Sequence, residues 1–346
     1  MIDRLQSIVP IRKANSGYFH YRTNKWRFDR RFHDGAPVAI DRPVFLIGTQ
    51  NGGLTLLARI LHRHTHAISV TGDHRYWAGE DEAQDALADI LPEDFGWRRI
   101  DLPGYPDRDH SWVYGNDDFL PFYRRKADEL DPAQGARYRR VLQGILRQHG
   151  SDKRFIDKSQ SLTLRVGAVH RALSEHRPFF VLISRDPYAV VWGQATRNGV
   201  LSKLDVPIEQ KVVLAAQHWR NSMQAALDDA ADQAEVQLRH WQFESILREP
   251  DRIVREICDF AELPWESKIL PSANDNIPWG SRSDAFNKRK WYPLRPGVND
   301  RYRAELPDWA AETIHELCGD IGERFGYEAP DVLRRAEDSS LQAGID

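Results

Sequence analysis

The chain has 346 residues, of which 41% are hydrophobic and 29% are charged, which suits a packed core beneath a well-solvated surface. Its formal net charge of −3 argues against a general nucleic-acid binder, because such proteins are usually basic. Two cysteines, Cys258 and Cys318, are too few for a disulfide framework, and each stands in a helix-like context that favours a small core residue.

No apolar run approaches the roughly 20 residues of a membrane span, and the first residues lack the apolar centre of a secretory signal. We therefore expect a cytoplasmic protein without a transmembrane segment. Residues 1–42 are weakly patterned, and the stretch from Arg12 to Phe32 is basic and aromatic. We interpret residues 1–42 as a solvated N-terminal arm, with a peripheral membrane contact as the alternative.

Four short apolar runs predict buried strands: Val44–Ile47, Arg154–Ile156, Phe179–Ile183 and Val236–Leu238. The runs lack alternation and are separated by helical patterns, which is typical of a parallel sheet covered on both faces. Apolar residues at helical spacing occur over about 56–61, 162–173, 187–191, 208–227 and 253–263. The pattern predicts one three-layer α/β domain over residues 1–346, with a central parallel sheet of four or five strands.

Residues 71–150 lie between the first predicted helix and the second predicted strand, and they are rich in aromatics, prolines and acids. A segment of this length inside an α/β domain is usually functional. We expect an inserted, mostly helical acceptor region whose aromatic rings could stack on sugars. For any single aromatic, a place in a small core of the insertion is the alternative.

The segment "GTQNGGLT", Gly48–Thr55, connects the first strand to a helix. Gly48, Gly52 and Gly53 allow backbone N–H groups to turn inward, and with the helix N-terminus they would form an anion pocket without side-chain charge. Leu54 stands where the Walker pattern requires lysine, so that pattern is not met. A tight strand-to-helix turn is the alternative interpretation.

Two cations directly follow predicted strands. Lys158 follows the second strand and Arg185 the third, and the carboxyl ends of parallel strands meet at one edge, where ligands of open α/β sheets bind. The guanidinium of Arg185 suits phosphate because it offers bidentate donors and a permanent charge. The alternatives are a surface pair of Arg185 with Asp186 that caps the next helix, and a solvated Lys158.

The order of these elements resembles the sulfotransferases that use 3′-phosphoadenosine-5′-phosphosulfate (PAPS). "PVFLIGTQNGGLTLLARIL" is similar to the family's 5′-phosphosulfate loop, "FFVLISRDPYAVVWG" to its 3′-phosphate segment, and "FIDKSQ" to its E-K-[ST]-P element. "WQFESILREPDRIVREICDFAELP" resembles a later element whose glutamate matches Glu244. The resemblance covers about Pro43 to Pro264, with a gap through the insertion. It implies a P-loop-like fold and PAPS-dependent sulfuryl transfer to a hydroxyl, with no metal ion.

The chain departs from the family pattern G-x-x-[RK]-S-G-T-[ST] at three positions. The loop cation falls on Asn51, the serine on Gly52 and the first threonine on Leu54. In the 3′-phosphate segment Arg185 is retained, but a serine falls on Gly193. The resemblance still implies that the donor is bound by the loop and by these two positions, which together are Thr49, Gln50, Asn51, Gly52, Gly53, Leu54, Thr55, Arg185 and Gly193.

Sulfuryl transfer requires a cation near the leaving oxygen and a base for the acceptor proton. Lys158 is our first candidate for the charge that Asn51 cannot supply. The base is expected in "VTGDHRYWAGEDE", which offers Asp73, His74, Glu80, Asp81 and Glu82. We rank His74 first, because the ordinary pKa of histidine suits the task, and Glu80 second.

The basic stretch "NKRKW" near the C-terminus is the remaining candidate. The resemblance implies that a basic C-terminal loop, residues 280–300, closes over the 3′-phosphate, with Arg289 and Lys290 as its donors. Arg197 is a weaker candidate for the same phosphate. The alternative is a solvated run of surface charge.

Other functions stay open at this point. A P-loop kinase-like phosphotransferase shares the strand-loop-helix opening, although Leu54 argues against it. A catalytically inactive relative that binds PAP (3′-phosphoadenosine-5′-phosphate) or a polysaccharide would explain the altered loop. A metal site on His62, His64 and His66 is disfavoured, because no acidic partner follows at metal-site spacing. The expected acceptor is a small molecule or glycan, with a carbohydrate or glycolipid preferred from family habit.

Overall fold

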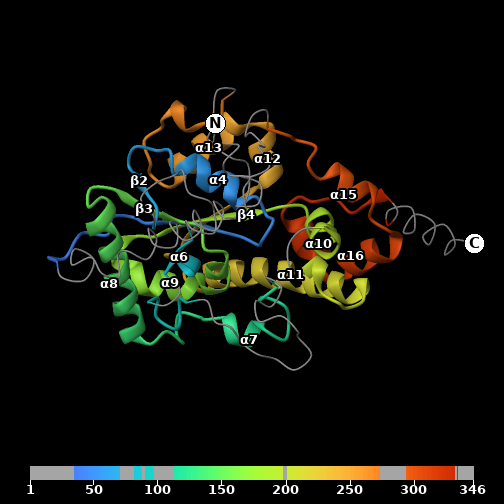
Figure 1. Ribbon diagram of the computed structural model, residues 1–346, viewed down its shortest axis with the longest axis horizontal. Coiled ribbons are helices and arrows are strands. Elements are labelled where there is room, and N and C mark those ends of the chain that lie inside the picture. Colours follow the sequence, from blue (N-terminus) through green and yellow to red (C-terminus); the bar gives the residue numbers. More distant parts are fainter. Residues whose placement is uncertain are drawn as a thin grey trace, which may run out of the picture.

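The computed structural model describes residues 35–70, 82–87, 90–96, 113–197, 201–272, 294–331 and 333. Within these ranges one sheet has five strands in the order β2-β3-β1-β4-β5, and every neighbouring pair is parallel (Figure 1). The strands are β1 Val44–Ile47, β2 Ala67–Ile68, β3 Arg154–Asp157, β4 Phe179–Ser184 and β5 Gln237–Gln242. The predicted α/β class with a parallel sheet of four or five strands is confirmed.

Helices cover both faces of the sheet. One face carries α4 Leu54–Leu61, α12 Phe243–Arg248 and α13 Pro250–Phe260, which lie together above the sheet in Figure 1. The opposite face carries α8 Pro132–His149, α9 Val166–Leu173, α10 Pro187–Thr196, α11 Ile208–Asp232 and α16 Asp308–Arg324. Side chains of β1 alternate between the two cores, with Phe45 on the α11 side and Leu46 on the α4 side.

Two details of the sheet differ from the sequence prediction. The fourth apolar run was expected to be buried, but β5 is an edge strand on which Trp241 is the single buried residue. A strand at the end of the order has a neighbour on one side only, so its polar side chains reach solvent. Strand β2 was not predicted, because two residues are too few to show a pattern.

The shorter helices are α6 Ala83–Ala86, α7 Leu120–Tyr123 and α15 Asp300–Ala304, with 3₁₀ turns at Gln160–Arg165, Ser174–His176, Leu201–Lys203 and Ser267–Ile269. The described parts of the predicted insertion, residues 71–150, contain α6, α7 and α8. Of these, α8 packs into the main core through Tyr138, Leu142 and Ile145. None of the described helices combines the length and apolarity that crossing a membrane requires.

The chain order places three strand ends side by side. After β1 the chain runs to β2 and returns to β3, and it then passes across β1 to β4. The carboxyl ends of β3, β1 and β4 are therefore neighbours, with Phe45 opposite Asp157 on one side and Ile47 opposite Leu182 on the other. Ligands of open α/β sheets bind at such a point, where successive connections leave in opposite directions.

Candidate active site

At two positions of the loop after β1, the backbone adopts a conformation that only glycine accommodates. Gly48 has φ 150° and Gly53 has φ 92°, both in the region that side chains disfavour. A Cβ on Gly48 would collide with the carbonyl oxygen of Ile183, and one on Gly53 would collide with the ring of Phe243. Asn51 also has a left-handed backbone, with φ 61°. The loop therefore packs tightly against β4 and α12.

Three neighbouring segments hold this loop through its backbone amide and carbonyl groups. Thr163 accepts a hydrogen bond from the Gly48 amide at 2.8 Å and donates to the Gly48 carbonyl at 3.1 Å. The side-chain amide of Gln194 on α10 donates to the carbonyl of Gln50 at 2.8 Å. Arg185 donates from Nη1 to the carbonyl of Asn51 at 2.9 Å. None of these contacts uses the amides of Leu54 and Thr55, whereas the Leu56 amide donates to the Gly53 carbonyl at 3.1 Å.

The start of α4 has the features of an anion site. The first amides of a helix lack acceptors within the helix, and no side chain caps the N-cap residue Gly53. No acidic side chain lies in the first turn to repel an anion. Thr49 Oγ1 and Asn51 Nδ2 are buried without a hydrogen-bond partner among the described residues. These unused donors fit a sulfate or phosphate group, whereas the Leu54 side chain is buried and leaves only its amide to the loop.

Arg185 at the end of β4 is 9% exposed and contacts neutral oxygens. Besides the Asn51 carbonyl, it donates from Nε to Asn299 Oδ1 at 2.8 Å. Its guanidinium carbon lies 5.5 Å from the ring centroid of Phe243. Burial lowers the pKa of Arg185, although Glu244 opposes this shift. The guanidinium is thus held rigidly beside the loop, with its charge not cancelled by a direct ion pair in the described part of the chain.

Glu244, the glutamate of the family element, positions Arg185 indirectly, through a hydrogen bond to Asn299. Its carboxylate accepts hydrogen bonds from the Asp186 amide at 3.0 Å and from the Tyr327 hydroxyl at 3.1 Å. It also accepts from the side-chain amide of Asn299, the residue that binds Arg185. Glu244 therefore fixes the orientation of Asn299, and through Asn299 that of the guanidinium.

The alternative of an Arg185–Asp186 surface pair is wrong. Asp186 caps α10 by accepting from the Tyr188 amide at 3.0 Å, and its other oxygen binds Arg303. Gly193 is buried inside α10 and offers no side chain. Arg197 is exposed and forms an ion pair with Glu305, so it lies in a surface pair.

Lys158 after β3 is buried, and the alternative of a solvated lysine is wrong. The side chain is 1% exposed, and its ammonium donates to Oε1 of Glu82, which is itself 4% exposed. Burial raises the pKa of Glu82, and Lys158 offsets part of that rise. A carboxylate with a raised pKa next to a buried ammonium is a typical arrangement for a base beside a charge stabiliser.

Hydrogen bonds to residues 157–161 hold the segment that carries Glu82. The Ala83 amide donates to Asp157 Oδ1 and the Gln84 amide to Ser159 Oγ, each at 3.0 Å. The Gln84 side chain donates to Gln160 Oε1 at 3.1 Å and accepts from the Ser161 amide at 2.9 Å. Sequence reasoning listed Glu82 among five candidates but did not rank it first, since nothing local showed that it pairs across 76 positions with Lys158.

Other predicted site residues lie outside the described residues. These are His74, Glu80, Arg289 and Lys290, so their roles stay predictions. The histidines considered for a metal are bound elsewhere: His62 Nε2 lies 3.2 Å from the Ile156 carbonyl and His64 Nε2 lies 2.6 Å from the Pro264 carbonyl. Within the described ranges, no cluster of three His, Cys, Asp or Glu side chains is placed to hold a metal ion.

A model of the Sulfotransferase family matches residues 43–267, a range that contains the loop, Lys158, Arg185 and Glu244. The chain belongs to the sulfotransferase family. By sequence, none of the curated proteins matches this sulfotransferase-family chain.

Solved sulfotransferases share its fold at low sequence identity. The sulfotransferase domain from the curacin biosynthetic pathway is 16% identical, with a TM-score of 0.53, and the match covers 84% of this chain and 99% of that domain. The sulfotransferase domain from the Synechococcus PCC 7002 olefin synthase is 19% identical, with a TM-score of 0.51 and coverage of 86% and 99%. Sulfotransferase STF9 from Mycobacterium avium is 15% identical, with a TM-score of 0.55 and coverage of 89% and 82%.

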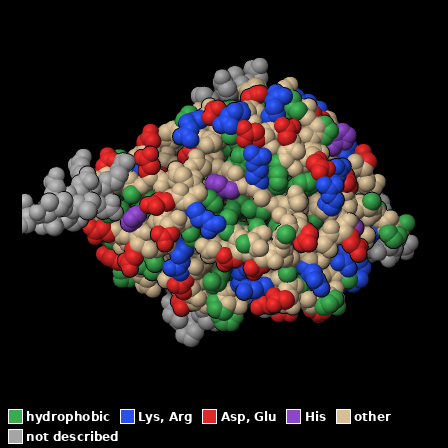
Figure 2. All heavy atoms as spheres, turned by 180° about the vertical axis from the view of Figure 1, so that it is seen from behind, with side chains coloured by type: hydrophobic (Ala, Val, Ile, Leu, Met, Phe, Trp, Pro, Cys, Tyr) green, Lys and Arg blue, Asp and Glu red, His purple; other side chains and the backbone are tan. Residues whose placement is uncertain are grey.

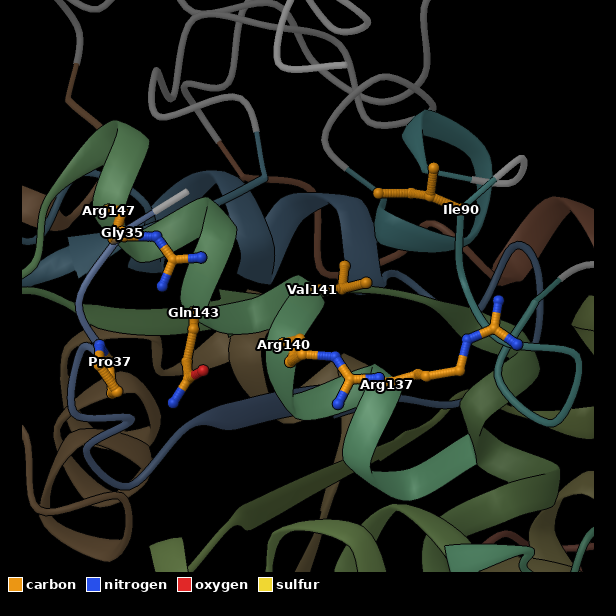
Figure 3. Close-up of a pocket in the computed structure, with 8 residues that line it drawn as sticks. All are labelled: Gly35, Pro37, Ile90, Arg137, Arg140, Val141, Gln143 and Arg147. Atoms are coloured by element: carbon orange, nitrogen blue, oxygen red, sulfur yellow. The ribbon is translucent and has the colours of Figure 1, made fainter. Parts of the chain in front are cut away.

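This sulfotransferase-family chain also has a surface concavity of about 490 Å³ (Figure 3), and its lining includes none of the predicted site residues. It is lined by Gly35, Pro37, Ile90, Arg137, Arg140, Val141, Gln143 and Arg147. Most of these residues come from α8. On the face drawn in Figure 2, basic and acidic side chains are interspersed, which agrees with the small net charge.

Proposed function

We propose that this chain transfers the sulfuryl group of PAPS to a hydroxyl of an acceptor. The observation that carries the proposal is the position of a charge-free anion loop between two buried cations, Lys158 and Arg185, on the strands that flank β1. Family membership supports sulfuryl transfer as the reaction class. When bound, PAPS would supply the activated sulfuryl group.

The loop residues fit the phosphosulfate end of such a donor. The amides at the start of α4, together with Thr49 Oγ1 and Asn51 Nδ2, would surround its oxygens. Among the described residues, Arg185 is the candidate to bind the 3′-phosphate. Arg289 and Lys290 remain predicted donors to this phosphate. Gly193 could approach the nucleotide only through its backbone.

Glu82 and Lys158 would divide the chemical step between them. The acceptor hydroxyl loses its proton to the Glu82 carboxylate while its oxygen forms a bond to sulfur. The bond from sulfur to the bridging oxygen breaks, and the electron pair stays on that oxygen, where Lys158 stabilises the charge. Once Glu82 is protonated, it no longer neutralises the Lys158 ammonium. The full positive charge of Lys158 is then available to stabilise the negative charge on the leaving oxygen. His74 and Glu80 stay alternative bases.

We propose a carbohydrate or glycolipid hydroxyl as the acceptor, as the family resemblance suggests. Two similar domains are described as belonging to the curacin biosynthetic pathway and to an olefin synthase. Their origin supports a hydroxyl on a biosynthetic intermediate as the second candidate. Both acceptors need the same proton transfer, so Glu82 and Lys158 would serve either.

Calorimetry without Mg²⁺ tests the donor directly. We expect PAP to bind in the micromolar range, while adenosine 5′-phosphate, which lacks the 3′-phosphate, binds at least tenfold more weakly, because a charge-assisted contact contributes roughly 1.5–3 kcal/mol. Tighter binding of ATP than of PAP would overturn the proposal and favour the phosphotransferase. Transfer of labelled sulfate from PAPS to any acceptor would reject the catalytically inactive relative.

A further inference from the structure

A second buried carboxyl, that of Asp157, adjoins the pair of Glu82 and Lys158. Asp157 is the last residue of β3 and is 0% exposed. Its Oδ1 accepts from the Ala83 amide at 3.0 Å, whereas its Oδ2 is buried without a hydrogen-bond partner among the described residues. A buried carboxylate oxygen that lacks a hydrogen-bond donor is costly in its ionised state, so this environment disfavours ionisation of Asp157.

The charges of this cluster do not balance when all its groups are ionised. Glu82 and Asp157 would carry two negative charges and Lys158 one positive charge, and all three side chains are almost completely buried. Glu82 directly contacts the ammonium of Lys158. Burial removes the surplus negative charge from bulk solvent, so the two carboxyls compete for one proton and titrate as a coupled pair.

The surroundings of the cluster point to the same coupling. Lys158 and Asp157 face Glu82 from β3, and Gln84 faces it from its own segment. Tyr138 faces Asp157 from α8, and its buried hydroxyl likewise has no partner in the described part of the chain. Burial raises the pKa of both carboxyls, and the charge of Asp157 adds to the rise at Glu82. The Ser159 side chain opposes part of the rise at Asp157.

We propose that Asp157 is a positioning residue for proton transfer, which holds the Glu82 segment through Ala83 and opposes the ionisation of Glu82 across the buried cluster. Glu82 thereby binds the proton of the acceptor hydroxyl more firmly than an isolated carboxylate would. Asp157 itself forms and breaks no covalent bond, since the proton moves from the acceptor oxygen to Glu82 and Asp157 only sets how favourable that move is. The inference rests on the proposed function for the identity of the proton donor alone.

Carbon-13 NMR of protein labelled at glutamate carboxyls tests the coupling without donor or acceptor. The signal of Glu82 is identified by its loss in Glu82→Gln, and its titration midpoint is then compared between the unchanged protein and Asp157→Asn. The asparagine retains an oxygen that can accept from the Ala83 amide but removes the charge. We expect the midpoint of Glu82 to shift to lower pH, and the acid limb of kcat/KM to shift with it.

Ser161→Ala is the matched control, because it removes a buried hydroxyl that has no hydrogen-bond partner among the described residues, and it keeps the bond from the Ser161 amide to Gln84. We expect the midpoint of Glu82 to stay unchanged in this variant. An unshifted midpoint in Asp157→Asn, or an equal shift in Ser161→Ala, would overturn the inference.

A reciprocal measurement covers the case in which Asp157→Asn does not fold. Coupling between two titrating groups acts equally in both directions, so Glu82→Gln should lower the midpoint of the Asp157 carboxyl. An unchanged Asp157 midpoint would also overturn the inference. If the midpoints shift in a protein that transfers no sulfate from PAPS, the coupling stands and the proposed function fails, so the two are tested separately.

Discussion

Lys158 and Arg185 occupy corresponding places on the two strands that flank β1, yet their charges are treated in opposite ways. Lys158 ends in a buried ion pair with Glu82. Arg185 is also buried, but it donates to neutral oxygens of Asn51 and Asn299. The guanidinium therefore keeps its attraction for an anionic ligand, whereas the charge of the ammonium is offset by the Glu82 carboxylate.

We propose that this difference separates donor binding from reaction on the two sides of the same loop. A cation that must hold a ligand in the ground state works best if no carboxylate competes for it. A cation that must act only as charge develops in the transition state can be masked beforehand. We accordingly propose that Arg185 binds the donor and that Lys158 stabilises the leaving oxygen.

The largest expected effect is the loss of turnover in Lys158→Ala. Removing one donor to a developing charge typically costs about 3–4 kcal/mol, which corresponds to roughly 10²- to 10³-fold in kcat. Steady-state assays with PAPS measure this loss, with Lys153→Ala as the matched control, since Lys153 lies just before β3 in a partly exposed pair with Asp152. Near-normal turnover in Lys158→Ala would remove Lys158 from this role.

The same substitution should destabilise the fold, because it leaves Glu82 buried without its cation. Breaking a buried pair from one side typically costs about 3–5 kcal/mol, whereas replacing both partners is often nearly neutral. Urea unfolding should therefore show a large loss for Lys158→Ala and recovery in the double variant Lys158→Met, Glu82→Gln. Recovery of turnover together with stability in the double variant would contradict a chemical role for the pair.

A cation placed in the loop should partly replace the charge of Lys158 and so reduce the functional difference between Lys158 and Arg185. In the Lys158→Ala background, Asn51→Lys places an ammonium at the position where the family pattern has one, and we expect a gain of about tenfold in turnover. The gain is limited because Asn51 has a left-handed backbone, with φ 61°, which disfavours lysine. Asn51→Gln is the uncharged control, and an equal gain there would show that charge is not the cause.

The buried His218 has no counter-charge among the described residues, and its titration should affect stability. Burial lowers the pKa of His218 to about 3, and its Nδ1 accepts from the Gly115 amide at 3.0 Å. The unfolded chain therefore binds a proton that the fold excludes, and stability is lost as pH falls below about 6.5. We expect about 2 kcal/mol of loss between pH 6.5 and pH 5 to disappear in His218→Asn.

Chemical unfolding at several pH values measures the slope for His218→Asn, with the exposed His66→Asn as the control. Glu82 should act in the opposite direction, since its raised pKa makes the folded state lose stability as pH rises through that pKa. An unchanged acid slope in His218→Asn would show that the loss arises from other groups.

The sequence predicted the parts of this site that depend on local pattern. A run such as Val44–Ile47 is too short for a helix and too apolar for the surface, so a buried strand was the consistent interpretation. The same logic placed Lys158 and Arg185 at one edge, because the carboxyl ends of parallel strands coincide. The unusual backbone of the loop was likewise predicted from its glycines.

Contacts between distant segments could not be predicted in this way. The partner of Lys158 is 76 positions away, and five candidate residues occurred within one polar segment. Asn299 approaches Arg185 from 114 positions away, and no local pattern marks it. The exposure of β5 depends on its place in the strand order, which requires the whole topology. Burial and long-range pairing decided each of these points.

Calorimetric titration of PAP into Arg185→Ala and Lys158→Ala, measured side by side, tests the division of roles most directly. We predict that Arg185→Ala loses roughly tenfold or more in affinity, since a charge-assisted contact to phosphate is lost, whereas Lys158→Ala binds PAP like the unchanged protein. Affinity lost only in Lys158→Ala, or lost equally in both variants, would contradict the assignment of binding to Arg185 and reaction to Lys158.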